Sequence, residues 1–127
     1  SLVSTNPNVR EKVGAILRDI AREYNVIVDG RDAGSVIFPD ADLKLYVTAS
    51  IETRANRWQK AQEKLGNCYS LQEAIQQISE RDERDSKRAI APLIIPKDAI
   101  VVDNSMQTQQ EATEHLYQLV IKNIAQQ

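Results

Sequence analysis

Two arginine-containing stretches carry the residue types best suited to binding an anion. The first is the segment DGRDAG at 29–34, in which Gly30 and Gly34 permit a tight turn around Arg31 and Asp32. A guanidinium can grip a phosphate through two parallel N–H groups, and a neighbouring carboxylate can accept from an exocyclic amine or hold an arginine in place. A plain Asp-Gly turn has the same sequence, so this segment alone leaves both interpretations open.

The second stretch is RDERDSKR at 81–88, which contains four basic and three acidic residues and no apolar residue. Arg81, Asp85 and Arg88 are spaced i, i+4, i+7, so in a helix they share one face, with Arg84 at its edge. Three guanidinium groups on one face repel one another unless acids or an anionic ligand neutralise them. The alternative is an ordinary lattice of ion pairs on a solvated helix.

Four other charged residues bear on the same question. Asp82 and Glu83 are expected to turn away from the arginine face of that helix. Arg54 and Arg57, on an earlier predicted helix, are weaker candidates for phosphate binding.

The composition is that of one globular domain. The chain has 127 residues, 42% of them hydrophobic and 27% charged, and no apolar run is long enough to span a membrane. The formal net charge of −2 gives no basic excess for nucleic-acid binding. Cys68 is the only cysteine, which fits a reducing compartment. We therefore expect a cytoplasmic protein with no membrane and no nucleic-acid partner.

Helices that alternate with short apolar strands are expected to position these residues. Capping signals at Ser50, Ser70 and Thr108 each precede a run with helical periodicity. Short runs of apolar and β-branched residues indicate strands. The expected elements are helices over about 7–24, over 51–65, and after Ser70 and Thr108, with strands over 25–30, 43–48 and 99–103.

The order of these elements predicts an α/β fold with a parallel sheet that helices cover on both faces. In such folds ligands bind beyond the carboxyl ends of the strands, which is where the segment 29–34 stands. The sequence has no G-x-x-x-x-G-K-[ST] phosphate loop, because none of its glycines, at 14, 30, 34 and 66, starts that pattern. One cysteine and one histidine exclude a zinc cluster.

The segments DGRDAGSVIFPDADLKLYVTAS at 29–50 and ERDERDSKRAIAPL at 80–93 closely resemble the bacterial cytidylate kinase family. The resemblance runs along the whole chain, and its paired motifs are long and specific. It implies a parallel-sheet P-loop nucleoside-monophosphate-kinase fold. It also implies transfer of the γ-phosphoryl group of ATP to CMP or dCMP, with Mg²⁺ bound as Mg-ATP.

The resemblance further implies functions for single residues of this chain. For the CMP site it implies contacts from Ser1, Arg10, Arg31, Asp32, Arg81, Asp85 and Arg88. Ser1, Arg10 and Asp32 would face the cytosine, Arg31 the acceptor phosphate, Arg81 and Asp85 the ribose and phosphate, and Arg88 the base and phosphate. Arg54, Arg57 and Arg84 lie in or beside a region, about 52–90, that resembles the family's mobile lid over ATP.

The family's amino-terminal portion has no counterpart in this sequence. The resemblance therefore implies that residues 1–127 are the carboxy-terminal part of a single kinase domain, without its first strand and phosphate loop. We expect the chain alone to be inactive, because the missing loop and the substrate would supply the ligands of Mg²⁺. We also expect unpaired strand edges to drive self-association or pairing with the missing portion, although intact members of the family are usually monomers.

Other functions remain open at this stage. A kinase acting on UMP or AMP would use the same arginine face, although the motif at 29–34 and its spacing to 80–93 favour cytidine. A non-catalytic interaction module would use 81–88 as a docking helix, and the absent phosphate loop favours this for the chain alone. A single-stranded nucleic-acid binder fits less well, because the chain is acidic and has only six aromatic residues (Phe 1, Trp 1 and Tyr 4).

Overall fold

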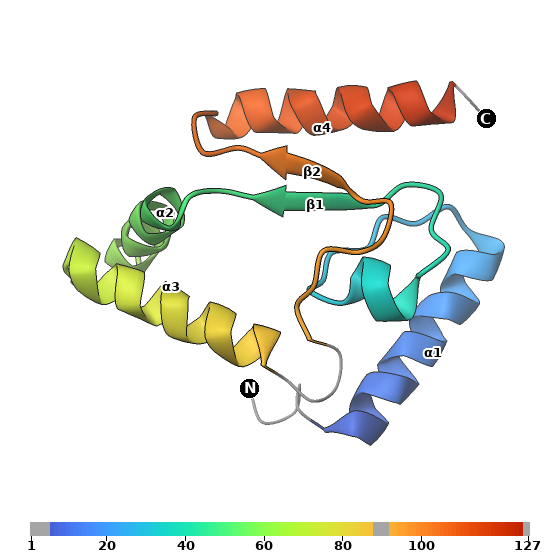
Figure 1. Cartoon of the computed structure of the whole chain (residues 1–127), viewed down its shortest axis with the longest axis horizontal. Coiled ribbons are helices and arrows are strands. Elements are labelled where there is room, and N and C mark those ends of the chain that lie inside the picture. Colours follow the sequence, from blue (N-terminus) through green and yellow to red (C-terminus); the bar gives the residue numbers. More distant parts are fainter. Residues whose placement is uncertain (1–5, 88–91, 126–127) are drawn as a thin grey trace.

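The computed structural model describes residues 6–87 and 92–125. Helix α1 (Pro7–Glu23) is followed by a π-helical turn, η2 (Ala33–Ile37), and by strand β1 (Leu45–Thr48). Helices α2 (Ile51–Glu63) and α3 (Leu71–Ser86) come next, and strand β2 (Ile100–Asp103) and helix α4 (Gln109–Ile124) complete the order. Figure 1 shows α2 and α3 beyond the carboxyl end of β1 and α1 on the other side of the molecule.

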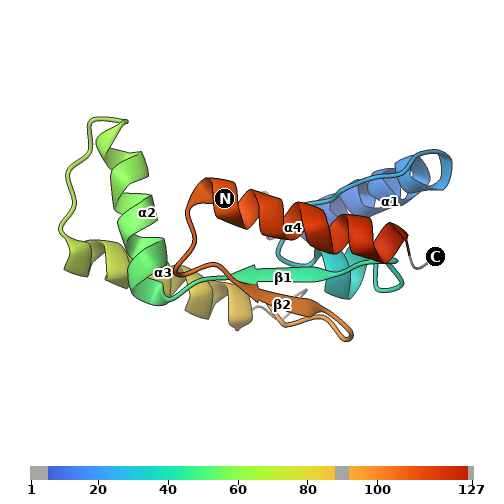
Figure 2. The ribbon, with the colours of Figure 1, turned by 90° about the horizontal axis from the view of Figure 1, so that it is seen from above.

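The sheet of the described residues is one parallel pair of strands. β1 and β2 pair in the register Leu45↔Ile100 to Thr48↔Asp103, and α4 lies along the pair in Figure 1 and over it in Figure 2. The expected parallel α/β arrangement is confirmed for these elements. The other edge of β1 has no strand partner among the described residues.

Two expectations about the sheet are wrong: the strand over 25–30 and the cover by helices on both faces. Residues 25–30 form no strand, and Ile27 is 95% exposed. A strand has to pair its backbone N–H and C=O groups with a neighbour, and no described strand lies beside this segment. The run at 99–103 does form β2, but only Val102 is buried, while Ile100 and Val101 are exposed. The sheet is therefore not covered on both faces by the described residues.

Side chains cap the later helices as the sequence predicted. The Ser70 hydroxyl accepts from the backbone N–H of Glu73 at 3.2 Å, and Glu73 Oε2 accepts from the backbone N–H of Ser70 at 2.8 Å. Thr108 and Glu111 make the same reciprocal pair at the start of α4, and it holds the pKa of Glu111 below its usual value. Gly66, with φ +82°, lies in the turn that follows α2.

The capping carboxylate of α3 gives a prediction about pH. The backbone N–H and then the hydroxyl of Ser70 hold the pKa of Glu73 below its ordinary value of 4.5. Stabilisation by this carboxylate is therefore complete above that ordinary pKa, and it is lost as the pH falls through the lowered pKa of the folded state. In an NMR titration we expect the Ser70 amide proton to shift with a midpoint below 4.5 and to lose this shift in Glu73→Gln. A midpoint at or above that value would contradict the cap.

Helices α2 and α3 share the small core of the molecule. Ala55 and Ala74 are completely buried where the two helices cross, and Ile78 is nearly so. Trp58 packs against Tyr69 with ring centroids 4.8 Å apart. We call this pair of helices the α2–α3 hairpin. Its packing fixes the last turns of α3, where the charged residues lie.

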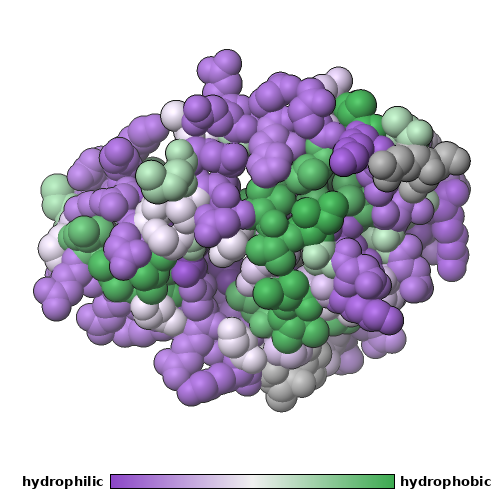
Figure 3. All heavy atoms as spheres, turned by 45° about the horizontal axis from the view of Figure 1, so that its top comes forward, coloured by the Kyte–Doolittle hydropathy of each residue, from purple (hydrophilic) through white to green (hydrophobic). Residues whose placement is uncertain are grey.

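The apolar side of α1 is exposed. Helical spacing brings Val9, Val13, Ile16, Ile20 and Tyr24 to one side of this helix, as is typical of a buried face, but these residues are between 38% and 66% exposed. We call these five residues the α1 stripe. Figure 3 shows one face of the molecule, on which further hydrophobic side chains (green) are exposed and lie together.

Candidate functional site

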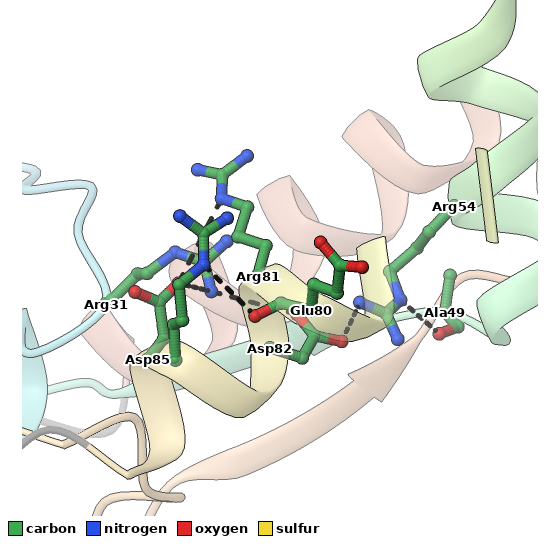
Figure 4. Close-up of polar contacts among 8 residues, drawn as sticks. Arg31, Ala49, Arg54, Glu80, Arg81, Asp82 and Asp85 are labelled. Atoms are coloured by element: carbon green, nitrogen blue, oxygen red, sulfur yellow. Dashed lines mark hydrogen bonds and ion pairs between the residues drawn. The ribbon is translucent and has the colours of Figure 1, made fainter. Parts of the chain in front are cut away.

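Five charged side chains form an alternating row between the turn at 29–34 and the α2–α3 hairpin. Arg31 Nη1 lies 2.7 Å from Asp85 Oδ2 and 3.9 Å from Asp82 Oδ1. Arg54 Nη1 lies 2.5 Å from Asp82 Oδ2, and Arg81 Nε lies 4.0 Å from Asp85 Oδ2. Figure 4 shows these contacts, with the Arg81 guanidinium directed away from the helix. We call these five residues the arginine row.

Three separate elements position the arginine row. Arg31 comes from the turn before η2, and Asp82 and Asp85 come from the last turns of α3. Arg54 comes from the first turns of α2, where its Nε donates to the Ala49 carbonyl at 3.0 Å just beyond β1. The row therefore ties the turn at 29–34 and the carboxyl end of β1 to the α2–α3 hairpin.

The arginine row carries surplus positive charge that solvent can reach. It holds three guanidinium groups and two carboxylates, so one positive charge is in excess. The Arg81 side chain is 57% exposed, whereas Asp85 is only 17% exposed. A partly desolvated arrangement of fixed guanidinium groups is suited to a phosphate, because ion pairs strengthen as water is excluded.

A second pair of charges lies nearby on the turn and α1. Arg10 and Asp32 form an ion pair with side-chain exposures of 20% and 13%. The pair lines a hollow of about 230 Å³, to which Arg18 on α1 and Val36 on η2 also contribute. A guanidinium and a carboxylate side by side can donate to a carbonyl and accept from an amine on one heterocyclic edge.

The structure brings most of the predicted site residues together and places two elsewhere. Arg57 donates to the Asn104 side chain at 2.7 Å and to the backbone carbonyls of Asn104 and Gln107 at 2.9 and 3.3 Å. It therefore ties α2 to the loop after β2. Arg84 is exposed and donates to the carbonyl of Glu80 one turn earlier. Ser1 and Arg88, two of the predicted contacts, lie outside the described residues.

The loop after β2 has its own internal hydrogen bonds. The hydroxyl and then the backbone N–H of Ser105 donate to Asp103, which holds the pKa of that carboxyl below its usual value. The Ser105 hydroxyl also accepts from the backbone N–H of Ser50 at 2.7 Å, just before α2 begins. Together with Arg57, these contacts fix the base of the α2–α3 hairpin against the sheet.

Asp82 is a site residue that the sequence interpretation missed. It was expected to turn away from the arginine face, but it contacts both Arg31 and Arg54. Its position three residues before Asp85 was the available signal, because side chains at i and i+3 are neighbours on a helix.

The described residues favour anion binding over other chemistry. No group of three or more His, Cys, Asp or Glu side chains in the ranges 6–87 and 92–125 could hold a metal ion. None of the helices described is long and apolar enough to cross a membrane. A larger hollow of about 420 Å³ lies at the amino-terminal ends of the strands, but its lining has three acids, Asp40, Asp42 and Asp98, against one cation, Lys44. We therefore place the candidate site at the arginine row and the Arg10–Asp32 pair.

Comparison with known proteins gives one consistent result. A family model described as "Cytidylate kinase" matches residues 1–122. The chain is 41% identical to the cytidylate kinase of Caldanaerobacter subterraneus subsp. tengcongensis, over 97% of this chain and 55% of that protein. It is 39% identical to the cytidylate kinase of Acholeplasma laidlawii, over 94% of this chain and 54% of that protein. It is also 40% identical to a bifunctional pantoate ligase/cytidylate kinase of Synechococcus, over 94% of this chain and 22% of that protein.

Proposed function

This chain belongs to the cytidylate kinase family, and on that premise we propose that its protein transfers the γ-phosphoryl group of ATP to CMP or dCMP, giving CDP or dCDP. The chain spans about half the length of the cytidylate kinases of Caldanaerobacter and Acholeplasma that it matches. The activity is therefore proposed for the whole protein, and the described residues supply the acceptor site. ATP and CMP or dCMP would be its small-molecule partners, and we propose the cytoplasm as its compartment.

The observation that carries this proposal is the arginine row. Phosphoryl transfer needs alignment of the two substrates and positive charge around the phosphoryl oxygens, with little covalent help from the protein. Arg31 and Arg81 would hold the acceptor phosphate, and Asp85 would orient both guanidinium groups through its ion pairs with them. The α2–α3 hairpin, within the region at about 52–90, would act as the lid, with Arg54, Arg57 and Arg84 on its helices.

The Arg10–Asp32 pair would recognise the base. Asp32 would accept from the exocyclic amine of cytosine, and Arg10 would donate to the ring carbonyl. Uracil carries a carbonyl where cytosine carries that amine. A site built around a buried acceptor therefore disfavours UMP, because the carboxylate and the carbonyl would both be left without a donor.

The chain alone would not complete the reaction. None of its glycines starts a phosphate-loop pattern, and the described residues offer no cluster of carboxylates for a metal. The ligands of Mg²⁺ are therefore proposed to come from the ATP phosphates and from protein outside this sequence. In a coupled assay with ATP, CMP and the pure chain, we expect no turnover above background. Turnover at a normal kinase rate would refute this part of the proposal.

The acceptor site itself can be tested with this chain. In a calorimetric titration we expect CMP to bind at least about tenfold more tightly than UMP, because uracil lacks the exocyclic amine from which Asp32 would accept. Equal binding of both nucleotides would favour a different monophosphate kinase. Binding of neither would leave a docking helix as the better interpretation of the charged end of α3.

The exposed apolar surfaces of the chain are suited to contact with another protein surface. The α1 stripe and the free edge of β1 would be covered in the whole protein by the portion outside this sequence. In the isolated chain we propose that the α1 stripe is covered by a second copy.

A further inference from the structure

We propose that Asp82 is a positioning residue that joins the phosphate-binding Arg31 to Arg54 of the α2–α3 hairpin and lowers the affinity of the arginine row for phosphate. The inference rests on the proposed function, because it concerns the same acceptor site. It assigns a task to a residue that the predicted contacts did not include.

The geometry gives the two oxygens of Asp82 different partners. Oδ2 lies 2.5 Å from Nη1 of Arg54, and Oδ1 lies 3.9 Å from Nη1 of Arg31 (Figure 4). The Arg54 guanidinium is held a second time, because its Nε donates to the Ala49 carbonyl at 3.0 Å. Asp82 therefore has one tight and well-anchored partner and one looser partner.

Partial burial strengthens the interactions between these charges. The side chains of Arg31, Asp82 and Arg54 are 32%, 30% and 34% exposed, so water screens them less than it screens a fully exposed pair, but a ligand can still reach them. A phosphate that binds Arg31 would lie within several ångströms of the Asp82 carboxylate, and two negative charges so close repel. Asp82 therefore opposes the ligand that Arg31 attracts.

The anchor on Arg54 limits that opposition. Because Arg54 neutralises much of the Asp82 charge, the repulsion that reaches the phosphate depends on whether Arg54 stays in place. Arg54 lies on α2 and Asp82 on α3, so a shift of α2 relative to α3 that withdrew Arg54 would leave the full charge of Asp82 facing Arg31. The packing of α2 on α3 and the affinity for the acceptor phosphate are thus linked through one carboxylate.

Asp82→Asn tests the repulsion, with inorganic phosphate as the probe and the thermal midpoint of the chain as the readout at constant ionic strength. One unshared unit charge about 6 Å away, at an effective dielectric constant of about 40 to 80, changes an anion's affinity about 3- to 10-fold. Because Arg54 shares the charge of Asp82, we expect phosphate to bind Asp82→Asn more tightly by a factor at the lower end of that range. The matched control is Glu83→Gln, the next residue of the same helix, which removes the same charge. Glu83 is exposed, and Lys87 lies 2.5 Å from it and holds its pKa below the usual value.

The comparison between the two variants decides the inference. Equal effects of phosphate on Asp82→Asn and Glu83→Gln would overturn it, since net charge alone would then explain the change. No stabilisation of any variant by phosphate would overturn it as well, because the arginine row would not be an anion site.

The link between Asp82 and Arg54 has its own test. In an Arg54→Gln background the Asp82 charge is no longer shared, so we expect Asp82→Asn to tighten phosphate binding by a larger factor than it does with Arg54 present. The same factor in both backgrounds would overturn the link.

The proposed function fails in a different way. If phosphate binds Asp82→Asn more tightly but CMP binds no better than inorganic phosphate, the assignment of Asp82 stands and the cytidine site is refuted. If CMP is preferred and the two variants behave alike, the cytidine site stands and the assignment of Asp82 is refuted.

Discussion

Arg31→Ala is expected to weaken CMP binding about 100-fold while leaving the binding of cytidine unchanged. A charge-assisted hydrogen bond contributes about 1.5–3 kcal/mol, and a guanidinium can make two of them to one phosphate. The loss is larger than that of the contact alone, because Asp85 and Asp82 would then face the phosphate without the cation that lies between them. Cytidine lacks the phosphate, so its affinity reports only the Arg10–Asp32 pair and the general integrity of the fold.

Two further variants sharpen the Arg31 experiment. Arg31→Lys keeps the charge but loses the two-pronged geometry, so we expect a loss of about tenfold, between wild type and Arg31→Ala. Arg22→Ala is the matched control, because Arg22 is a 79% exposed arginine of α1 that pairs only with Asp19 at 2.9 Å in the described structure. Calorimetry with CMP and with cytidine gives all of these values. A change of less than threefold for Arg31→Ala would remove Arg31 from the acceptor site.

Local sequence signals predicted the helices well, because the forces that start and end a helix act within a few residues. Ser70 with Glu73 and Thr108 with Glu111 predicted helix starts, and both capping boxes are present. The π-helical turn after Asp32 was not predicted. Its hydrogen bonds, such as that from Phe38 N–H to the Ala33 carbonyl at 2.7 Å, have no comparable sequence signature.

Strands and burial were predicted less well, because both depend on distant partners. The segment at 25–30 has the composition of a strand, yet it has no strand beside it in the described structure. The α1 stripe has the spacing of a buried face, yet it is exposed. Periodicity shows which side chains share a face, but it does not show what covers that face.

The sequence predicted which residues lie near one another at the candidate site better than it predicted which pairs of them are in contact. Arg31 and Asp85 were expected to serve one ligand, and the structure places them 2.7 Å apart. Helical spacing alone could not show that Asp82 contacts Arg54, because that contact depends on how α2 crosses α3. Nor could it show that Arg57 contacts Asn104, because that contact depends on how α2 lies against the loop after β2.

The exposed α1 stripe leads to the second large effect: Ile16→Glu is expected to convert an associating chain into a monomer. Ile16 lies at the centre of the stripe and is 54% exposed. Burying an isoleucine side chain contributes about 1.5–3 kcal/mol, and a second copy would lose this and would have to desolvate a carboxylate as well. We therefore expect the dissociation constant for self-association to rise at least about 100-fold.

The control for this experiment is Met106→Glu, which adds the same charge at a large apolar residue that is 96% exposed and lies between β2 and α4. Sedimentation equilibrium over a range of chain concentrations should show association of wild type and Met106→Glu and a monomer for Ile16→Glu. A wild-type chain that stays monomeric at every concentration would show that no second copy covers the stripe. Equal weakening by both variants would place the contact elsewhere, because only Ile16→Glu puts a charge within the five residues that helical spacing brings to one side of α1.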